Sequence, residues 1–504
     1  MVKKSNPTIL VVTPEITYLP NGMGNMANNL NAKAGGLADV SASLVSSLFE
    51  LGADVHVALP HYRRMFHVEV ANLISAELRK YQSKLPDARI HLAEDRIFYY
   101  RENVYSSYHH VNPKLALAFQ REVMNNIIQT VQPDLIHCND WMTGLVPALA
   151  RRLNIPCLFT VHNIFTMNST LAEIEDRGID AAEFWKYLYF QRIPYNYEES
   201  RNNNNVDLLV SGIFSSHFIN TVSPTFLDEI VDGRHDWVPA NVRAEVAAKR
   251  ASGCATGILN APDPSFNPTD DPMIEENFNS SSHIQGKIAN KVSLQKKLGL
   301  NINPDAPMLF WPSRLDPIQK GCQLLSDILF NLVSKYWEED LQIVFVANGA
   351  YQPIFRDIVR WHNLHERVAV CDFEEGLSHH GYAASDFMIM PSRFEPCGLP
   401  QMVSCLYGSL PIVHDTGGLH DTVEHLDIAN QTGNGFLFED YDSNGFMWAI
   451  DQAMDFYSKP KELKNAVISR VMDYAKNTFN HDVTARAYFD IYEEMLDRPI
   501  VKSF

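Results

Sequence analysis

The stretch Leu410-Pro-Ile-Val-His-Asp-Thr-Gly-Gly-Leu419 joins a short apolar run to a glycine pair, and residues that can open a helix follow at Asp421-Thr-Val-Glu-His425. A run this short, apolar on both faces, is typical of a buried strand in a parallel sheet. A strand, a glycine turn and a helix in this order form one unit of an α/β fold. The turn then lies at the carboxyl end of the strand, where ligands of such sheets bind.

Similar apolar runs recur along the chain, separated by lengths that suit helices. They lie at 9–12, 55–59, 135–137, 158–161 and 218–222 in the first half, and at 308–311, 343–346, 368–370, 387–390 and 411–413 in the second. This alternation predicts two Rossmann-like α/β domains. The stretch Asn260–Pro272, crowded with Pro, Asp and Asn, marks the boundary between them. We interpret the polar patch Asn202–Asn205 as a surface loop.

Composition excludes several classes of protein. The chain has 504 residues, 46% of them apolar and 20% charged, which argues against a disordered or collagen-like chain. With 42 basic and 60 acidic residues its net charge is −18, which argues against a nucleic-acid-binding or anionic-membrane surface over the whole molecule. Seven cysteines without a C-x-x-C pair predict neither a disulfide framework nor a zinc site.

No apolar stretch approaches the about 20 residues needed to cross a bilayer. Glu15 arrives before the core of a signal peptide could be completed. We therefore expect a cytoplasmic protein.

A second glycine pair lies in Lys33-Ala-Gly-Gly-Leu-Ala-Asp-Val40, before a segment with apolar residues at helical spacing. A Gly-Gly entry to a helix lets backbone N–H groups approach a phosphate, and Lys33 can add a positive charge. An ordinary flexible loop is the alternative for an isolated pair. Neither pair has the spacing of a dinucleotide fingerprint or a P-loop, so neither a nicotinamide cofactor nor ATP hydrolysis is indicated.

Two further segments contain charged residues after predicted strands. Arg314 and Lys320 lie in Ser313–Gly321, where a guanidinium fork and a compact ammonium can neutralise a diphosphate, although a solvated basic loop is an equal alternative. Glu395 and Cys397 lie in Pro391-Ser-Arg-Phe-Glu-Pro-Cys-Gly-Leu-Pro400. We favour Glu395 as the functional residue, because a buried Cys with no neighbouring base is usually inert.

These segments resemble the bacterial glycogen synthases and plant starch synthases, the ADP-glucose-using branch of the GT-B glycosyltransferases. Lys33–Val40 resembles the K-x-G-G-L signature, and His137-Cys-Asn-Asp-Trp-Met-Thr-Gly144 resembles the H-x-x-D-W segment. Thr160-Val-His-Asn163 and Asn220-Thr-Val-Ser-Pro224 also fit the family. The most specific likeness is Pro391–Val423, and the resemblance covers nearly the whole chain.

The resemblance implies a GT-B fold with two Rossmann-like domains facing across a cleft and a C-terminal helix, at 485–495, crossing back to the first domain. The predicted domains are an acceptor and catalytic domain at 1–255, a nucleotide-sugar domain at 256–480 and the returning segment at 481–504. The implied reaction is retaining transfer of glucose from ADP-glucose to the non-reducing end of an α-1,4-glucan. It implies no metal and no cofactor besides the ADP-glucose co-substrate. The expected partners are the nucleotide sugar and the glucan, with no nucleic acid and no membrane.

The resemblance also assigns roles to individual residues. The catalytic set it implies is Glu395, His162, Arg314, Lys320 and Lys33. The substrate-binding set it implies is Gly35, Gly36, Asp140, Asn163, Phe373, Cys397, Gly398, Leu399, Thr416, Gly417 and Gly418. In this assignment the cations hold the diphosphate, Glu395 contacts the transferring glucose and Phe373 packs against the nucleobase.

The chain departs from the family pattern in three places. The family's H-N-x-x-Y-Q-G segment reads His162-Asn-Ile-Phe-Thr-Met-Asn-Ser169, and its N-G-[IV]-D segment reads Asn260-Ala-Pro-Asp263. Arg314 and Lys320 are one residue further apart than usual, so their loop should bulge. Pro20–Asn31 resembles an insertion, either a mobile lid or a surface loop. These departures leave two alternatives open: a transferase that uses UDP-glucose or a small acceptor, or a catalytically weak glucan-binding relative.

Overall fold

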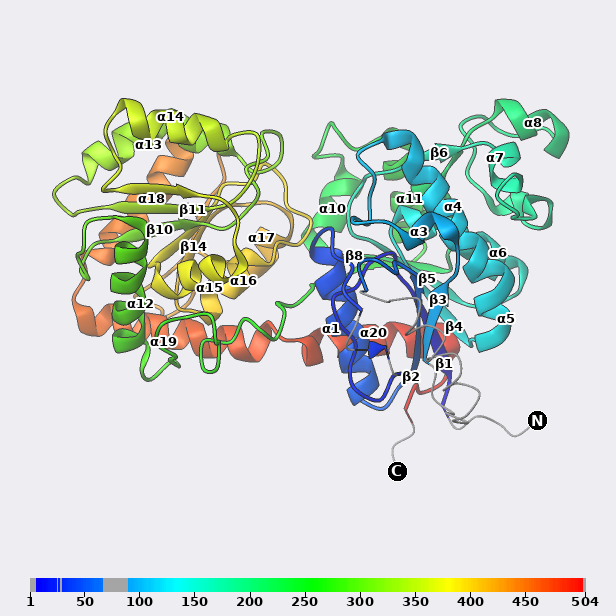
Figure 1. The fold of residues 1–504 in the computed structure, drawn as a ribbon, viewed down its shortest axis with the longest axis horizontal. Coiled ribbons are helices and arrows are strands. Elements are labelled where there is room, and N and C mark those ends of the chain that lie inside the picture. The colour runs from blue at the N-terminus through cyan, green and yellow to red at the C-terminus, as the bar shows by residue number, and fades with distance from the viewer. Residues whose placement is uncertain (1–5, 25, 28–29, 67–88, 502–504) are drawn as a thin grey trace. The chain divides into compact units, whose positions relative to one another are not determined.

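The computed structural model describes residues 6–24, 26–27, 30–66 and 89–501 (Figure 1). The chain divides into two compact units. Unit 1 comprises Met1–Val222, Leu227–Ile258 and His481–Phe504, and unit 2 comprises Ser223–Phe226 and Leu259–Asn480.

Unit 1 is built on a parallel sheet with the order β3-β2-β1-β4-β5-β8-β9. The strands are β1 (Thr8–Val12), β2 (Asp54–Pro60), β3 (Ile90–Ala93), β4 (Leu135–Asn139), β5 (Cys157–Val161), β8 (Phe218–Thr221) and β9 (Ala255–Gly257). β1, β4 and β5 are buried throughout. The strand order reverses between β1 and β4, and ligands of such sheets bind at the carboxyl ends of the two strands beside this reversal.

The helices of unit 1 cover both faces of this sheet, with α1 and α20 on one side and α5 and α6 on the other (Figure 1). They are α1 (Gly36–Glu50), α3 (Arg96–Tyr99), α4 (Asn112–Glu122), α5 (Ile128–Val131), α6 (Val146–Arg152), α7 (Leu171–Glu175), α8 (Tyr197–Asn203), α9 (Leu208–Ser215), α11 (Ala240–Ala251), α20 (His481–Leu496) and α10 (Pro224–Asp232), whose first residues, up to Phe226, belong to unit 2. A short antiparallel pair, β6 (Asn168–Ser169) and β7 (Val206–Asp207), lies outside the main sheet.

The C-terminal helix α20 is tied to unit 1 by buried tyrosines. The Tyr492 hydroxyl lies 2.7 Å from His137 Nδ1, and Asn220 Nδ2 donates to the Tyr488 hydroxyl at 3.0 Å. His137 and Asn220 lie on β4 and β8, so the helix contacts strands that are far from it in sequence.

Unit 2 is built on a second parallel sheet with the order β12-β11-β10-β13-β14-β15. The strands are β10 (Met308–Trp311), β11 (Gln342–Val346), β12 (Val368–Cys371), β13 (Phe387–Met390), β14 (Leu410–His414) and β15 (Phe436–Phe438). The helices are α12 (His283–Leu298), α13 (Cys322–Lys335), α14 (Gln352–Trp361), α15 (Glu375–Ala384), α16 (Pro400–Leu406), α17 (Gly417–Thr422), α18 (Ser443–Tyr457) and α19 (Lys461–Thr478). α13 and α14 lie on one side of the sheet, and α12, α15 and α16 on the other (Figure 1).

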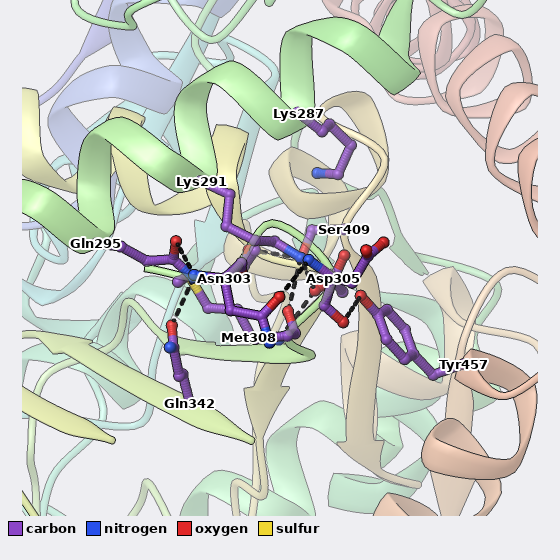
Figure 2. A network of polar contacts seen from close by, with 12 residues as sticks. Lys287, Lys291, Gln295, Asn303, Asp305, Met308, Gln342, Ser409 and Tyr457 are labelled. Atoms are coloured by element: carbon purple, nitrogen blue, oxygen red, sulfur yellow. Dashed lines mark hydrogen bonds and ion pairs between the residues drawn. The ribbon is translucent and has the colours of Figure 1, made fainter. Parts of the chain in front are cut away.

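At the amino ends of the unit 2 strands lies a polar network around Lys291 of α12, and Lys287 of the same helix lies beside it (Figure 2). Lys291 donates to the Asp386 carboxylate at 2.5 Å and to the Ala306 carbonyl at 2.8 Å. Lys287 donates to the carbonyls of Ala383 and Tyr407 at 3.2 and 2.9 Å, and burial lowers its pKa to about 7. These contacts lie at the amino ends of the strands, whereas ligands of parallel sheets bind at the carboxyl ends.

The ten strands predicted from apolar runs are confirmed, with bounds that differ by up to two residues. The sequence did not predict the strands β3, β9 and β15, which are short and lie at the edges of the two sheets, where burial on both faces is not required. The predicted C-terminal helix is present as α20.

Two predicted surface segments differ from the structure. In the patch at 202–205, residues 202, 203 and 205 are exposed as predicted, but the first two belong to α8, and Asn204 is buried, with a side chain that exchanges hydrogen bonds with the backbone of Arg192. In the segment at 20–31, residues 21, 22 and 31 are exposed, but Met23, Ala27 and Leu30 are buried and anchor the described part of the segment in the unit. Residues 25, 28 and 29 of that segment lie outside the described residues.

Within the described ranges, no helix combines the length and the apolar character that crossing a membrane requires.

Candidate active site

Three neighbouring strands of the unit 1 sheet are each followed, at their carboxyl ends, by a polar side chain. Glu15 follows β1, Asp140 follows β4 and His162 follows β5. β4 pairs with both β1 and β5, so the three strands leave the sheet side by side. Asp140 and His162 were predicted from the sequence to lie at the site, whereas Glu15 entered the sequence analysis only as the charge that excludes a signal-peptide core.

Asp140 has a strained backbone and a nearly unsolvated carboxyl group. Its φ of 62° and ψ of 177° fall in a region that residues other than glycine rarely adopt, and such strain is concentrated at functional sites. Asn163 Nδ2 donates to Asp140 Oδ2 at 2.8 Å, while Oδ1 is buried and has no hydrogen-bond partner among the described residues. Burial, with a contribution from the charge of Glu15, raises the pKa of Asp140 to about 8.

His162 is held as a neutral ring. Its Nε2 lies 2.9 Å from Asn139 Oδ1, and burial lowers the pKa of His162 to about 3. A neutral imidazole can donate or accept a hydrogen bond near a sugar without adding charge.

The glycine turn before α1 lies over a buried carboxylate. Residues 33–36 are exposed, whereas Glu15 beneath them is 2% exposed. Glu15 Oε2 accepts the backbone N–H groups of Ala34 at 2.6 Å and Gly35 at 3.1 Å. The N–H of Gly35 is therefore bound to the protein itself. Lys33 pairs with Asp39 in the first turn of α1, at 2.7 Å.

The sequence offered one signal for the role of Glu15: its position directly after the first predicted strand. What it could not show is that the chain between residues 16 and 32 folds back. Ile16 pairs with Ala32 through backbone hydrogen bonds of 3.0 and 2.7 Å, and this pairing brings the glycine turn over Glu15.

In unit 2, Lys320 and Glu395 form a buried ion pair after strands β10 and β13. Lys320 Nζ lies 2.5 Å from Glu395 Oε2, and the two side chains are 10% and 8% exposed. The Ser392 hydroxyl donates to the same oxygen at 3.2 Å. Two residues that the sequence assigned to the site are therefore in direct contact.

Arg314 and Lys320 lie on a turn that the Asp316 side chain closes. The carboxylate of Asp316 accepts the N–H groups of Ile318 and Gln319 at 2.9 and 2.8 Å. This turn accommodates the longer spacing between the two cations. Arg314 is exposed, and no described carboxylate forms an ion pair with it.

The glycine turn of unit 2 packs directly on the motif that contains Glu395. Gly417 has a positive φ of 47°, and the N–H of Gly418 donates to the main-chain carbonyl of Glu395 at 2.9 Å. A Cβ at Gly418 would lie 2.0 Å from the carbonyl oxygen of Cys397, so only glycine fits there. The turn starts at Thr416, the residue before α17.

The remaining predicted residues of unit 2 lie around this turn or at the next strand end. Cys397 is buried and burial raises its pKa to about 12, so it remains a thiol and is unsuited to act as a nucleophile. Gly398 has a positive φ of 71°, and Leu399 precedes α16. Phe373 follows β12 and is 54% exposed, and its backbone N–H donates to Asn348 Oδ1 at 3.0 Å.

Among the described residues, no group of three or more His, Cys, Asp or Glu side chains is arranged to hold a metal ion. The expectation that the reaction needs neither metal nor cofactor stays a prediction.

Comparison with known proteins assigns the chain to a family. Residues 8–238 match the family model described as starch synthase catalytic domain, and residues 306–455 match glycosyl transferases group 1. The chain is 34% identical over 463 residues to the glycogen synthase of Exiguobacterium sibiricum, covering 86% of this chain and 91% of the relative. The chain belongs to the glycogen synthase family. The glycogen synthase of Thermotoga maritima is 32% identical and covers 92% of this chain.

A solved structure supports the same family. The catalytic domain of starch synthase IV from Arabidopsis thaliana, bound to ADP and acarbose, superposes with a TM-score of 0.78 at 27% identity and covers 98% of this chain and all of that chain. The predicted class, two parallel α/β units of the GT-B type, is confirmed, as is the prediction of a glycosyltransferase.

Proposed function

We propose that this member of the glycogen synthase family transfers glucose from ADP-glucose to the non-reducing end of an α-1,4-glucan, with retention of configuration. The observation that carries the proposal is the buried pair of Lys320 and Glu395 next to the glycine turn at the carboxyl end of the unit 2 sheet. The ADP and acarbose named for the starch synthase IV structure, a nucleotide and a glucan-like oligosaccharide, support this choice of donor and acceptor.

The chemistry that unit 2 supplies is stabilisation of the leaving group. Negative charge accumulates on the diphosphate as the bond to glucose breaks, and positive side chains lower the energy of that state. Lys320 carries three N–H donors, of which Glu395 accepts one, so further donors remain for a phosphate. Arg314 supplies a second cation from the same turn.

Glu395 binds the transferring sugar in this proposal. Lys320 and Ser392 both donate hydrogen bonds to Oε2 of Glu395, so its Oε1 is left for a sugar hydroxyl. The fixed position of the carboxylate orients the glucose before the bond breaks. We do not assign Glu395 as a covalent nucleophile, because the two-carboxylate mechanism requires a second paired carboxylate, and the charged group that pairs with Glu395 is the ammonium of Lys320.

Unit 1 supplies the groups proposed to contact the sugar and the acceptor. His162 is neutral and Asn163 positions Asp140, whose Oδ1 has no partner among the described residues and can accept a hydroxyl. Lys33 and the turn at Gly35 and Gly36 are proposed to contact the donor. The roles of Phe373 at the base and of Thr416 and Gly417 at the phosphates also remain part of the proposal.

Turnover with a donor panel tests the proposal. The protein is incubated with glycogen and either ADP-glucose or UDP-glucose, labelled in the glucose, and both nucleotide release and incorporation are measured. We expect ADP release, and labelled product that an α-1,4-specific hydrolase degrades. In Glu395→Ala the rate of glucose transfer should fall by about a factor of 100 or more, and the melting temperature should show that the variant remains folded. Glu462→Ala, an exposed change on α19, serves as the matched control.

The same experiment separates the alternatives. A higher kcat/KM with UDP-glucose would replace the proposed donor. Retention on a glycogen affinity gel without turnover of either donor would make the protein a glucan-binding relative. Wild-type rates in Glu395→Ala would remove that residue from the mechanism.

A further inference from the structure

Glu15 is held rigidly beneath the turn that precedes α1. Its backbone carbonyl accepts a hydrogen bond from the Thr13 hydroxyl at 3.1 Å, and that hydroxyl also lies 2.9 Å from Ser41 Oγ on α1. The Tyr62 hydroxyl donates to the carbonyl of the preceding residue, Pro14, at 3.2 Å. The position of the carboxylate is therefore fixed from α1 and from the segment after β2.

Glu15 occupies two backbone N–H groups of the turn, and this determines which N–H groups are left to bind an anion. The N–H groups of Ala34 and Gly35 point to Glu15 Oε2. The first residues of α1, Gly36 and Leu37, have N–H groups without acceptors inside the helix. With the Ala34 and Gly35 N–H groups bound by the carboxylate, the donors left for an anion are those at the start of α1, beginning with Gly36 and Leu37.

We propose that Glu15 is a positioning residue for the nucleotide-sugar donor: its carboxylate fixes the turn at 33–36 so that the N–H groups of Gly36 and Leu37 are left for the donor diphosphate. This inference rests on the proposed function, since it assigns a role in binding the donor of that reaction. It adds a residue to the site that neither motif spacing nor the glycine pair identifies.

The position of Glu15 also makes its charge sensitive to pH. Burial raises the pKa of Glu15 to about 7, while the N–H groups of Ala34 and Gly35 oppose that rise because they favour the carboxylate. The titratable groups whose charges interact with that of Glu15 are Lys33, Asp39, Tyr62, Tyr105 and Asp140. Since the carboxylate is the stronger acceptor, the turn should be held best above about pH 7.

The experiment compares wild type with Glu15→Gln, which keeps the size of the side chain but removes its charge. Glu173→Gln is the matched control, because Glu173 also accepts a backbone N–H at the start of a unit 1 helix, from Thr170 at 2.9 Å. KM for ADP-glucose, KM for glycogen, kcat, the pH profile of kcat/KM and amide exchange at Ala34 and Gly35 are measured for each. Glu15→Asp provides a second, charged variant in case Glu15→Gln does not fold.

We expect Glu15→Gln to raise KM for ADP-glucose by about tenfold, with a smaller change in kcat and an unchanged KM for glycogen. The rise of kcat/KM with pH through about 7 should disappear, and the step that belongs to Asp140 should move to lower pH because a neighbouring negative charge is gone. The amides of Ala34 and Gly35 should exchange faster by about tenfold. Glu15→Asp should keep a pH step while its shorter side chain still raises KM, and Glu173→Gln should behave like wild type in all of these measurements.

Wild-type KM, pH profile and amide exchange in Glu15→Gln, or in Glu15→Asp if only that variant folds, would overturn the role of Glu15 and leave the proposed function intact. The same loss of donor affinity in Glu173→Gln would reduce the effect to general helix destabilisation and would also overturn it. A wild-type protein that neither turns over ADP-glucose nor binds ADP would overturn the proposed function and the donor role of Glu15 together.

Discussion

A glutamate holds the glycine turn in each unit, but the two glutamates use different atoms. In unit 1 the side chain of Glu15 accepts the N–H groups of Ala34 and Gly35. In unit 2 the main-chain carbonyl of Glu395 accepts the N–H of Gly418, and its side chain binds Lys320 instead. The unit 1 turn therefore depends on the ionisation of a side chain, whereas the unit 2 turn depends on backbone packing.

The glycines of the two turns differ in the same way. A Cβ at Gly35 would meet no atom within 4 Å, and its φ of −157° is open to other residues. A Cβ at Gly418 would lie 2.0 Å from the Cys397 carbonyl oxygen and 2.4 Å from its Cα. Similar Gly-Gly sequences therefore have different physical requirements.

The largest expected effect is at Gly418. Gly418→Ala must move the backbone at Cys397, and we expect the free energy of unfolding of unit 2 to fall by about 4 kcal/mol or more, with loss of transferase activity. Gly35→Ala is the matched variant, with an expected loss of less than about 1 kcal/mol. Differential scanning calorimetry measures both. Equal losses in the two variants would contradict the steric difference between the turns.

The next effect is at the ion pair of unit 2. Lys320→Met leaves the Glu395 carboxylate buried without its cation, which should lower the free energy of unfolding by about 3 kcal/mol and abolish most activity. The N–H of Gly418 should keep its protection from exchange, because its acceptor is a main-chain carbonyl. Lys335→Met removes the exposed pair with Asp451 and should cost less than about 1 kcal/mol. Faster exchange at Gly418 in Lys320→Met would show that this turn also depends on a side chain.

The amino ends of the two sheets extend the comparison. In unit 1 the Asp54 carboxylate accepts from the Thr8 hydroxyl and from Arg89, and a hydrogen bond with His56 is the main reason that the pKa of Asp54 lies well below its usual range. In unit 2 the charged groups at the amino ends of the strands are instead Lys287 and Lys291 of α12 (Figure 2). Both units should therefore gain stability as pH rises, but in different ranges: unit 1 in acid solution, where Asp54 loses its proton, and unit 2 above about pH 7, where the cost of a charged Lys287 is removed.

The last effect builds up gradually with pH, by a small step per pH unit, and follows from the lowered pKa of Lys287. Above about pH 7 the folded protein holds Lys287 neutral while the unfolded chain still binds its proton, so folding becomes more favourable as pH rises toward the ordinary lysine pKa. The difference in free energy of unfolding between wild type and Lys287→Met should grow by about 1.4 kcal/mol per pH unit from pH 7 to 10. Chemical denaturation at several pH values measures it. A difference that does not change with pH would mean that Lys287 is charged in the folded state.

The site was partly predictable because motif residues lie directly after strands. The positions of Asp140, His162, Lys320 and Glu395 follow from apolar runs that end in polar residues. Glu15 has the same placement but belongs to no glycine or cation cluster, and its partners lie 19 and 20 residues further along the chain. Asn204 was misread for a related reason: a run of asparagines suggests a loop, and only the fold supplies the backbone of Arg192 that buries it.

The sequence by itself determined the alternation of strands and helices, the two sheets and the residues that follow each strand, because these depend on local patterns of apolar and turn-forming residues. Only the tertiary structure decided which partner each polar group received. The carboxylate of Glu15 binds a turn that the chain reaches after folding back, and Lys320 meets Glu395 across 75 residues of sequence. Such pairings are set by strand order and loop path, which no local pattern records.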